Sequence, residues 1–132
     1  NDDNDNNNVL MTYGSFSIPW TAPEMLEKAG AVDGKFMASY GLPVDVYAFA
    51  IVSWEVMTRE IPWNDIEKPV FHNIANYVLD GKRPPISEVV KQETDLHFSE
   101  LYSIVQNCWE QNPNNRPKFD EIFKRLEKYH KW

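Results

Sequence analysis

The stretch from Asp45 to Trp63, D-V-Y-A-F-A-I-V-S-W-E-V-M-T-R-E-I-P-W, constrains the fold more than any other part of the chain. Residues 45–59 contain neither Gly nor Pro, which is enough for about four helical turns. Its large apolar side chains cover almost every direction around the helix axis, and a helix that is apolar on all sides is buried. We therefore expect a central core helix, with Asp45 in or just before the first turn as a possible cap and Pro62 as its stop signal.

Four further segments are predicted to be helices packed around this core. A short helix follows Pro23 and ends by Gly30, and a second runs from about residue 70 to the stop signal at Gly81. A third begins at His97 and a last one follows Lys118. Apolar residues recur at helical spacing in the three longer segments: Val70, Ile74, Tyr77, Val78; Leu101, Ile104, Val105, Cys108, Trp109; Phe119, Ile122, Phe123, Leu126. We expect a mainly α fold with one short and four main helices.

Composition excludes several classes of function. A chain of 132 residues is by default one domain, and the net charge of −7 argues against nonspecific binding to nucleic acid. No apolar run approaches the roughly 18–20 residues that cross a bilayer, and no signal peptide is visible. The single cysteine, Cys108, provides neither an internal disulfide nor a zinc site, so we expect no metal, a reducing compartment and a cytoplasmic location. Residues 1–8, N-D-D-N-D-N-N-N, are expected to be a disordered spacer.

Three blocks of sequence carry a resemblance to a known family. They are W-T-A-P-E at 20–24, the core stretch at 45–63 described above, and C-W-E-Q-N-P-N-N-R-P-K-F at 108–119. Together with the connector G-K-R-P-P-I at 81–86, they resemble the C-terminal part of a protein kinase domain, closest to the tyrosine kinase-like group of Ser/Thr kinases. The resemblance covers residues 9–132 and implies the helical large lobe of the kinase fold, in incomplete form.

The resemblance assigns a partner to Glu24. In kinases, the A-P-E glutamate pairs with an arginine placed as Arg116 is, in the R-P turn before the last helix. Without the resemblance, both residues read as solvated surface charges. The planar fork of an arginine suits bidentate pairing with a carboxylate. The implied role of the pair is to tie the activation segment to the helical floor of the lobe.

Further roles follow from the same resemblance. Asp45, which is otherwise only a helix cap, corresponds to an aspartate that supports the catalytic loop through backbone N–H groups. Ser17 and Trp20 belong to the substrate loop, and a hydroxyl at Ser17 favours Ser/Thr specificity. Phe16 departs from the family pattern, which has glycine there, and this puts the shape of the substrate loop in doubt.

Three hydroxyl side chains fall within the implied activation segment. Thr12, Tyr13 and Ser15 are candidate phosphorylation sites, and the alternative is that they are ordinary loop residues.

The motifs that carry phosphoryl transfer are absent from the sequence. There is no glycine-rich phosphate loop, no H-R-D aspartate and no D-F-G aspartate for Mg²⁺. We therefore expect no catalytic residue and no bound cofactor in this chain alone, with ATP, Mg²⁺ and a protein substrate implied for a complete parent domain. The alternative is a non-catalytic, kinase-derived fragment or pseudokinase that acts as a binding module, and an unrelated helical domain is a third reading. The oligomeric state is left open, and an exposed apolar patch is expected where the core helix lacks its partners.

Overall fold

The structure is a computed structural model that describes residues 18–29, 42–67, 71–86 and 96–129. Its elements in chain order are the 3₁₀-helix η1 (Ile18–Trp20), α2 (Pro23–Ala29), α3 (Leu42–Thr58), α4 (Phe71–Leu79), α6 (Leu96–Cys108), the 3₁₀-helix η2 (Pro113–Asn115) and α7 (Phe119–Glu127). No strand occurs in these four ranges. The expectation of a mainly α fold, with one short and four main helices, is confirmed for this part of the chain. Residues 1–8, expected to be a spacer, lie outside it.

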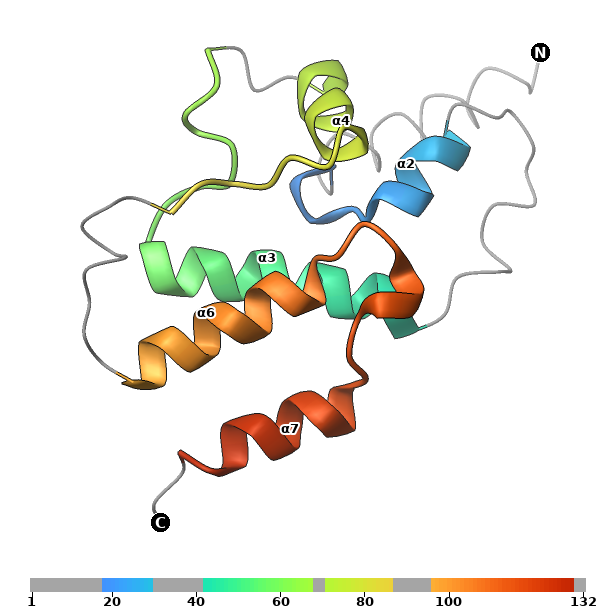
Figure 1. Ribbon diagram of the computed structural model, residues 1–132. Coiled ribbons are helices and arrows are strands. Elements are labelled where there is room, and N and C mark those ends of the chain that lie inside the picture. Colours follow the sequence, from blue (N-terminus) through green and yellow to red (C-terminus); the bar gives the residue numbers. More distant parts are fainter. Residues whose placement is uncertain (1–17, 30–41, 68–70, 87–95, 130–132) are drawn as a thin grey trace, which may run out of the picture.

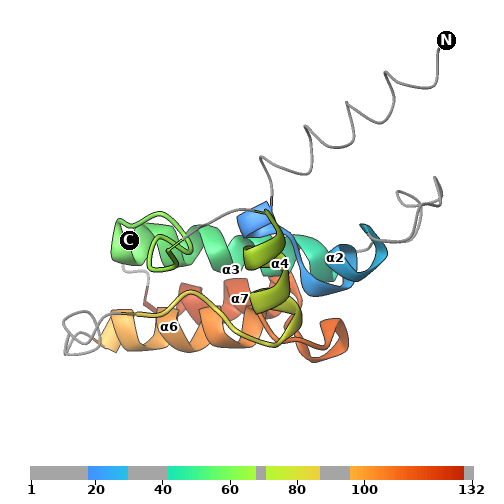
Figure 2. The ribbon, with the colours of Figure 1, turned by 90° about the horizontal axis from the view of Figure 1, so that it is seen from above.

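Helix α3 occupies the centre of the structure, as the sequence predicts. Figure 1 shows α6 running alongside α3, with α2 and α4 above the pair and α7 below it. Figure 2 shows the same arrangement of α3 and α6 from above. The side chains of Tyr47, Ala50 and Ile51 on α3 are fully buried, as are Ile104 and Val105 on α6. The two longest helices of the described chain therefore form the core by packing along each other.

One side of α3 remains uncovered, although its residues are apolar. Val52 is 49% exposed and Val56 is 71% exposed, whereas Trp54 between them is 1% exposed. The expectation of a helix buried on all sides is therefore wrong for this side, because none of the described segments covers it. These side chains supply exposed apolar surface of the kind that the sequence led us to expect.

The C-terminus of α3 is set by local hydrogen bonds instead of by Pro62. The helix ends at Thr58, and the next residue, Arg59, adopts a φ of 57° in the left-handed region that ends helices. The Arg59 N–H still donates to the Glu55 carbonyl at 2.8 Å. The Thr58 hydroxyl donates to the Trp54 carbonyl at 2.8 Å and accepts from the Glu60 N–H at 3.2 Å. The predicted stop at Pro62 is therefore wrong, because the chain has already left the helix.

The C-terminus of α4 follows the sequence prediction closely. Gly81 has a φ of 84°, and its N–H donates to the Val78 carbonyl at 3.0 Å, while the Lys82 N–H donates to the Tyr77 carbonyl at 2.9 Å. These two bonds form a Schellman motif, in which the left-handed position favours glycine. A side-chain carbon at Gly81 would meet nothing within 4 Å, so backbone conformation alone accounts for the glycine.

Helix α7 is attached to the rest of the fold by a few contacts. Ile122 is 3% exposed, but Phe123 on the same predicted stripe is 64% exposed. Phe119 packs edge-to-face on Phe49 of α3, with ring centroids 5.9 Å apart. Arg125 bonds Glu100, Ser103 and Asn107 of α6. The apolar stripe expected from the sequence exists, but the described residues bury only part of it.

Candidate functional site

The segment that leads into α2 is held against the centre of the fold. Ile18 is 3% exposed and Ala22 is fully buried, and η1 packs against both α3 and α4. The Thr21 N–H donates to the Ile18 carbonyl at 3.0 Å, which closes the short 3₁₀ turn. Pro23 begins α2, where its missing N–H costs nothing. This local structure fixes the direction in which the Glu24 side chain points.

Glu24 and Arg116 form a bidentate ion pair across the fold. The Arg116 Nη1 and Nη2 atoms lie 2.6 and 2.8 Å from the two Glu24 carboxylate oxygens. The guanidinium also donates from Nη1 to the Pro43 carbonyl and from Nε to the Glu110 carbonyl, each at 2.9 Å. The Arg116 side chain is 0% exposed and the Glu24 side chain is 20% exposed. The sequence-predicted partners are thus brought together, and backbone carbonyls complete the coordination of the guanidinium.

The ring of Tyr47 contacts two arginines, one of which is Arg116 of this pair. The guanidinium carbons of Arg116 and Arg83 lie 5.2 and 5.1 Å from the centre of the Tyr47 ring. Burial raises the pKa of Tyr47 to about 12, and the two guanidinium charges oppose that shift. The phenol oxygen is buried and has no hydrogen-bond partner among the described residues. Tyr47 therefore serves as a neutral aromatic surface for two cations.

Arg83 was not singled out by the sequence analysis, although it lies in the G-K-R-P-P-I block. Its Nε donates to the Trp109 carbonyl at 2.8 Å and its Nη2 to the Gln111 side chain at 2.8 Å. Its Nη1 donates to the Val78 and Lys82 carbonyls at 3.3 and 2.7 Å. Burial lowers the pKa of the Arg83 guanidinium. Arg83 thereby joins the end of α4 to the end of α6. This role is visible only in the three-dimensional contacts of Arg83 and not in the sequence.

Trp20 reaches a carboxylate on the central helix. Its ring N–H donates a short hydrogen bond to Glu55 on α3, and both side chains are half-buried. Glu55 was also missed by the sequence analysis, because a glutamate on a predicted core helix gives no signal of its partner. The contact fixes the start of the W-T-A-P-E segment to α3, while the Glu24–Arg116 pair fixes its end.

Of the remaining predicted site residues, Asp45 alone lies within the described ranges. Asp45 lies in the first turn of α3 and is exposed. Ser17, in the predicted substrate loop, lies outside the described residues, as does Phe16. The candidate phosphorylation sites Thr12, Tyr13 and Ser15 lie outside them as well.

The described residues contain no group of three or more His, Cys, Asp or Glu side chains placed to hold a metal ion. Two open grooves lie beside α4. Lys82 and Arg83 line one of them, where Lys82 lies over the ring of Tyr77 and Arg83 donates to the Trp109 carbonyl. In the same part of the chain, no helix combines the length and the apolar character needed to span a membrane.

Comparison with known proteins agrees with the fold. The family model for protein tyrosine and serine/threonine kinases matches residues 1–126. A probable serine/threonine-protein kinase of Dictyostelium discoideum is 33% identical over 126 residues, 94% of this chain. Mitogen-activated protein kinase kinase kinase 7 of Homo sapiens is 32% identical over 114 residues, 86% of this chain. The chain therefore belongs to the protein kinase family, and its helices correspond to the helical large lobe.

The match covers a small part of each relative. It spans 7% of the Dictyostelium kinase and 16% of the human kinase. A putative serine/threonine-protein kinase/receptor of Acanthamoeba polyphaga mimivirus, 35% identical over 121 residues, is matched over 92% of this chain and 6% of its own length.

Proposed function

We propose that this chain forms the substrate-side and structural part of a protein kinase domain whose complete form transfers the γ-phosphate of ATP to Ser or Thr side chains of proteins. Membership of the kinase family supports the class of reaction, and the relatives are named as serine/threonine kinases. Ser17 in the substrate loop supports the same preference. The substrate is a protein, and nucleic acid is disfavoured by the net charge of −7.

The observation that carries this proposal is the buried pair between Glu24 and Arg116. It holds the end of the W-T-A-P-E segment against the helical floor through four hydrogen bonds from one guanidinium, two of them to Glu24 and two to backbone carbonyls. Trp20 is held to Glu55 at the other end of the segment. A loop fixed at both ends presents a constant backbone to a bound substrate, which is the function of a substrate loop in phosphoryl transfer to proteins.

Asp45 has a supporting role in the proposed complete domain. Its carboxylate is exposed in the first turn of α3, so it remains available to accept backbone N–H groups from a catalytic loop. The ATP phosphates and Mg²⁺ are held in that domain by groups other than the described residues. This chain alone is therefore proposed to bind neither ATP nor Mg²⁺, and its own residues bind and orient the protein substrate.

The test has two arms. In the first, Mg·ATP is titrated into this chain in a calorimeter, and we expect no saturable binding in the micromolar range. In the second, the gene is read upstream of Asn1, and a frame that encodes H-R-D and D-F-G is expressed with this chain and assayed on Ser, Thr and Tyr peptides. Transfer to Ser and Thr is expected. Micromolar Mg·ATP binding by this chain alone would refute the proposal that ATP and Mg²⁺ are held by other segments of the complete domain.

The alternative function, a non-catalytic binding module, is favoured by one observation. Apolar side chains are exposed on both α3 and α7, among them Val56 at 71% and Phe123 at 64%. Such surface is typical of a protein-interaction site. Stop codons throughout the upstream frame would favour this function over the first.

A further inference from the structure

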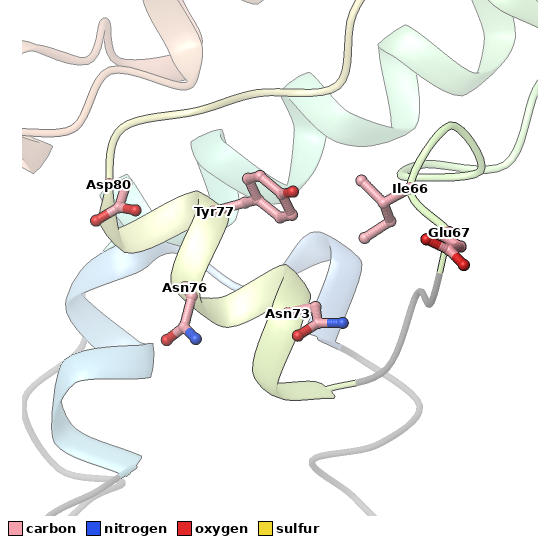
Figure 3. A pocket seen from close by; sticks show the side chains of 6 residues that line it. All are labelled: Ile66, Glu67, Asn73, Asn76, Tyr77 and Asp80. Carbon is pink, nitrogen blue, oxygen red and sulfur yellow. The ribbon is translucent and has the colours of Figure 1, made fainter.

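A groove runs between α4 and the segment that follows α3. It has a volume of about 450 Å³ and is lined by Ile66, Glu67, Asn73, Asn76, Tyr77 and Asp80. Figure 3 shows Ile66 and the ring of Tyr77 facing each other, with Glu67 near one end and Asp80 near the other. The groove therefore combines an apolar middle with an acid at each end.

The charge of the groove is not neutralised within the described residues. Neither Glu67 nor Asp80 forms an ion pair or side-chain hydrogen bond there, and both are exposed. A second hollow of about 510 Å³ continues past Ile66 and Tyr77 and adds Asp65, which is also exposed. Two basic side chains line it: Arg83 donates to the Trp109 carbonyl and to Gln111, and Lys82 lies over the ring of Tyr77. Three carboxylates are therefore open to a cation from outside.

The ring of Tyr77 already holds a cation of the same chain. Lys82 Nζ lies 4.4 Å from the centre of this ring, a distance at which the negative face of the ring attracts an ammonium group. Trp63 stacks on Tyr77 with ring centroids 5.9 Å apart and is itself 2% exposed, so the ring is fixed from the core. The carboxylates on either side of this ring, together with the Ile66 side chain, therefore remain for the head group and stem of a lysine or arginine from outside.

The groove lies next to the proposed substrate segment. Helix α4, which forms one wall, packs against both η1 and α2. A protein bound in the groove is therefore held near Trp20 and Glu24 without occupying the loop itself.

We infer that this groove is a docking site for a basic, extended segment of a protein that the complete kinase domain acts upon. Lysine or arginine side chains of that segment lie beside Glu67 and Asp80, and an apolar side chain between them packs on Ile66 and Tyr77. Charge complementarity selects this occupant, since the chain carries 20 acidic and 13 basic residues and three of the acidic ones line the groove and the hollow beside it. The role in substrate docking rests on the proposed function, whereas the binding itself does not.

Fluorescence anisotropy tests the binding without any phosphoryl transfer. The probe is a short fluorescein-labelled peptide of alternating arginine and leucine, with a peptide of alternating glutamate and leucine as its counterpart. We expect the arginine peptide to bind and the glutamate peptide not to bind, and we expect the affinity for the arginine peptide to fall as salt is added. Glu67→Gln and Asp80→Asn should each weaken it about two- to fivefold. The matched control, Glu127→Gln at an exposed position on α7, should leave it unchanged.

A second measurement locates the peptide on the unaltered chain. A lysine-containing version of the probe is coupled by carbodiimide, which joins an ammonium group directly to a neighbouring carboxylate, and the products are mapped by mass spectrometry. Coupling at Glu67, Asp80 or Asp65 is expected. Three outcomes would overturn the inference. The arginine peptide does not bind, the groove variants bind it as well as wild type, or coupling occurs only at carboxylates outside the groove. Loss of docking with kinase activity on short peptides intact would leave the proposed function standing.

Discussion

Removing the carboxylate of Glu24 is expected to destabilise the fold by far more than an ordinary surface substitution. Glu24→Ala leaves the Arg116 guanidinium, whose side chain is 0% exposed, with only the carbonyls of Pro43 and Glu110 as hydrogen-bond acceptors. Breaking a buried pair in this way costs about 3–5 kcal/mol. Because the Glu24 side chain is 20% exposed, water replaces part of the lost interaction, and we expect about 3 kcal/mol, the lower end of that range.

The chain contains a matched control for this prediction. Arg125 and Glu100 also form an ion pair, with an N–O distance of 2.9 Å, but both side chains are 28% exposed. Glu100→Ala should therefore cost only about 0.2–1 kcal/mol, as exposed pairs do. The two pairs share the same chemistry and similar distances, so the difference between them isolates the contribution of burial.

Urea unfolding followed by tryptophan fluorescence gives both free energies. Added NaCl should reduce the effect of Glu100→Ala and leave that of Glu24→Ala almost unchanged, since buried pairs are weakly screened. A double-mutant cycle of Glu24→Gln with Arg116→Met then measures the coupling between the partners. Equal destabilisation by Glu24→Ala and Glu100→Ala would refute the claim that the first pair fastens the W-T-A-P-E segment.

The other predictions concern two buried side chains, Tyr47 and Cys108, and the exposed apolar side of α3. Burial raises the pKa of Tyr47 from about 10 to about 12, so the folded state disfavours the ionised phenol. The contribution of Tyr47 to the free energy of unfolding is therefore complete below pH 10 and is lost as the pH rises towards 12. Tyr47→Phe should abolish this loss in urea titrations at different pH values. At pH 7 the same variant should be no less stable than wild type, because it removes a buried hydroxyl that has no partner among the described residues. Burial raises the pKa of Cys108 to about 11, and the side chain is 0% exposed, so a thiol reagent should modify it only after unfolding; rapid reaction of the folded chain would contradict its placement. Val52→Gln and Val56→Gln should reduce binding of a hydrophobic dye while changing the free energy of unfolding by no more than about 0.5 kcal/mol, and a larger loss would mean that these side chains are buried in solution.

The helices could be predicted from the sequence because hydrophobic periodicity is a local signal. The buried positions Ile74, Val78, Ile104 and Val105 were found in this way. The end of α3 was not, since it depends on the left-handed backbone at Arg59, which a non-glycine residue adopts only in particular surroundings. Periodicity likewise cannot say which side of an apolar helix finds a partner.

The candidate site was accessible from the sequence only in part. The Glu24–Arg116 contact was expected from the resemblance to kinases, and no local pattern indicates it. Arg83 and Glu55 were missed because their partners, the Trp109 carbonyl and the Trp20 ring N–H, are backbone and side-chain groups distant in sequence. Such contacts appear only once η1, α4 and α6 are placed on α3.

The position of Arg116 links the stability of the core to the geometry of the W-T-A-P-E segment. Its partners Glu24 and Pro43 are 92 and 73 residues away in sequence, so neither contact forms until α3 and the turn at η2 have been packed together. The guanidinium also lies over the ring of Tyr47, a fully buried residue of α3. A core substitution that shifts Tyr47 would therefore move the anchor of the segment without touching it. Conversely, loss of Glu24 removes one partner of Arg116 but leaves the Tyr47 ring and both carbonyls in place, so the packing of α3 on α6 should survive while the segment around η1 and α2 is released.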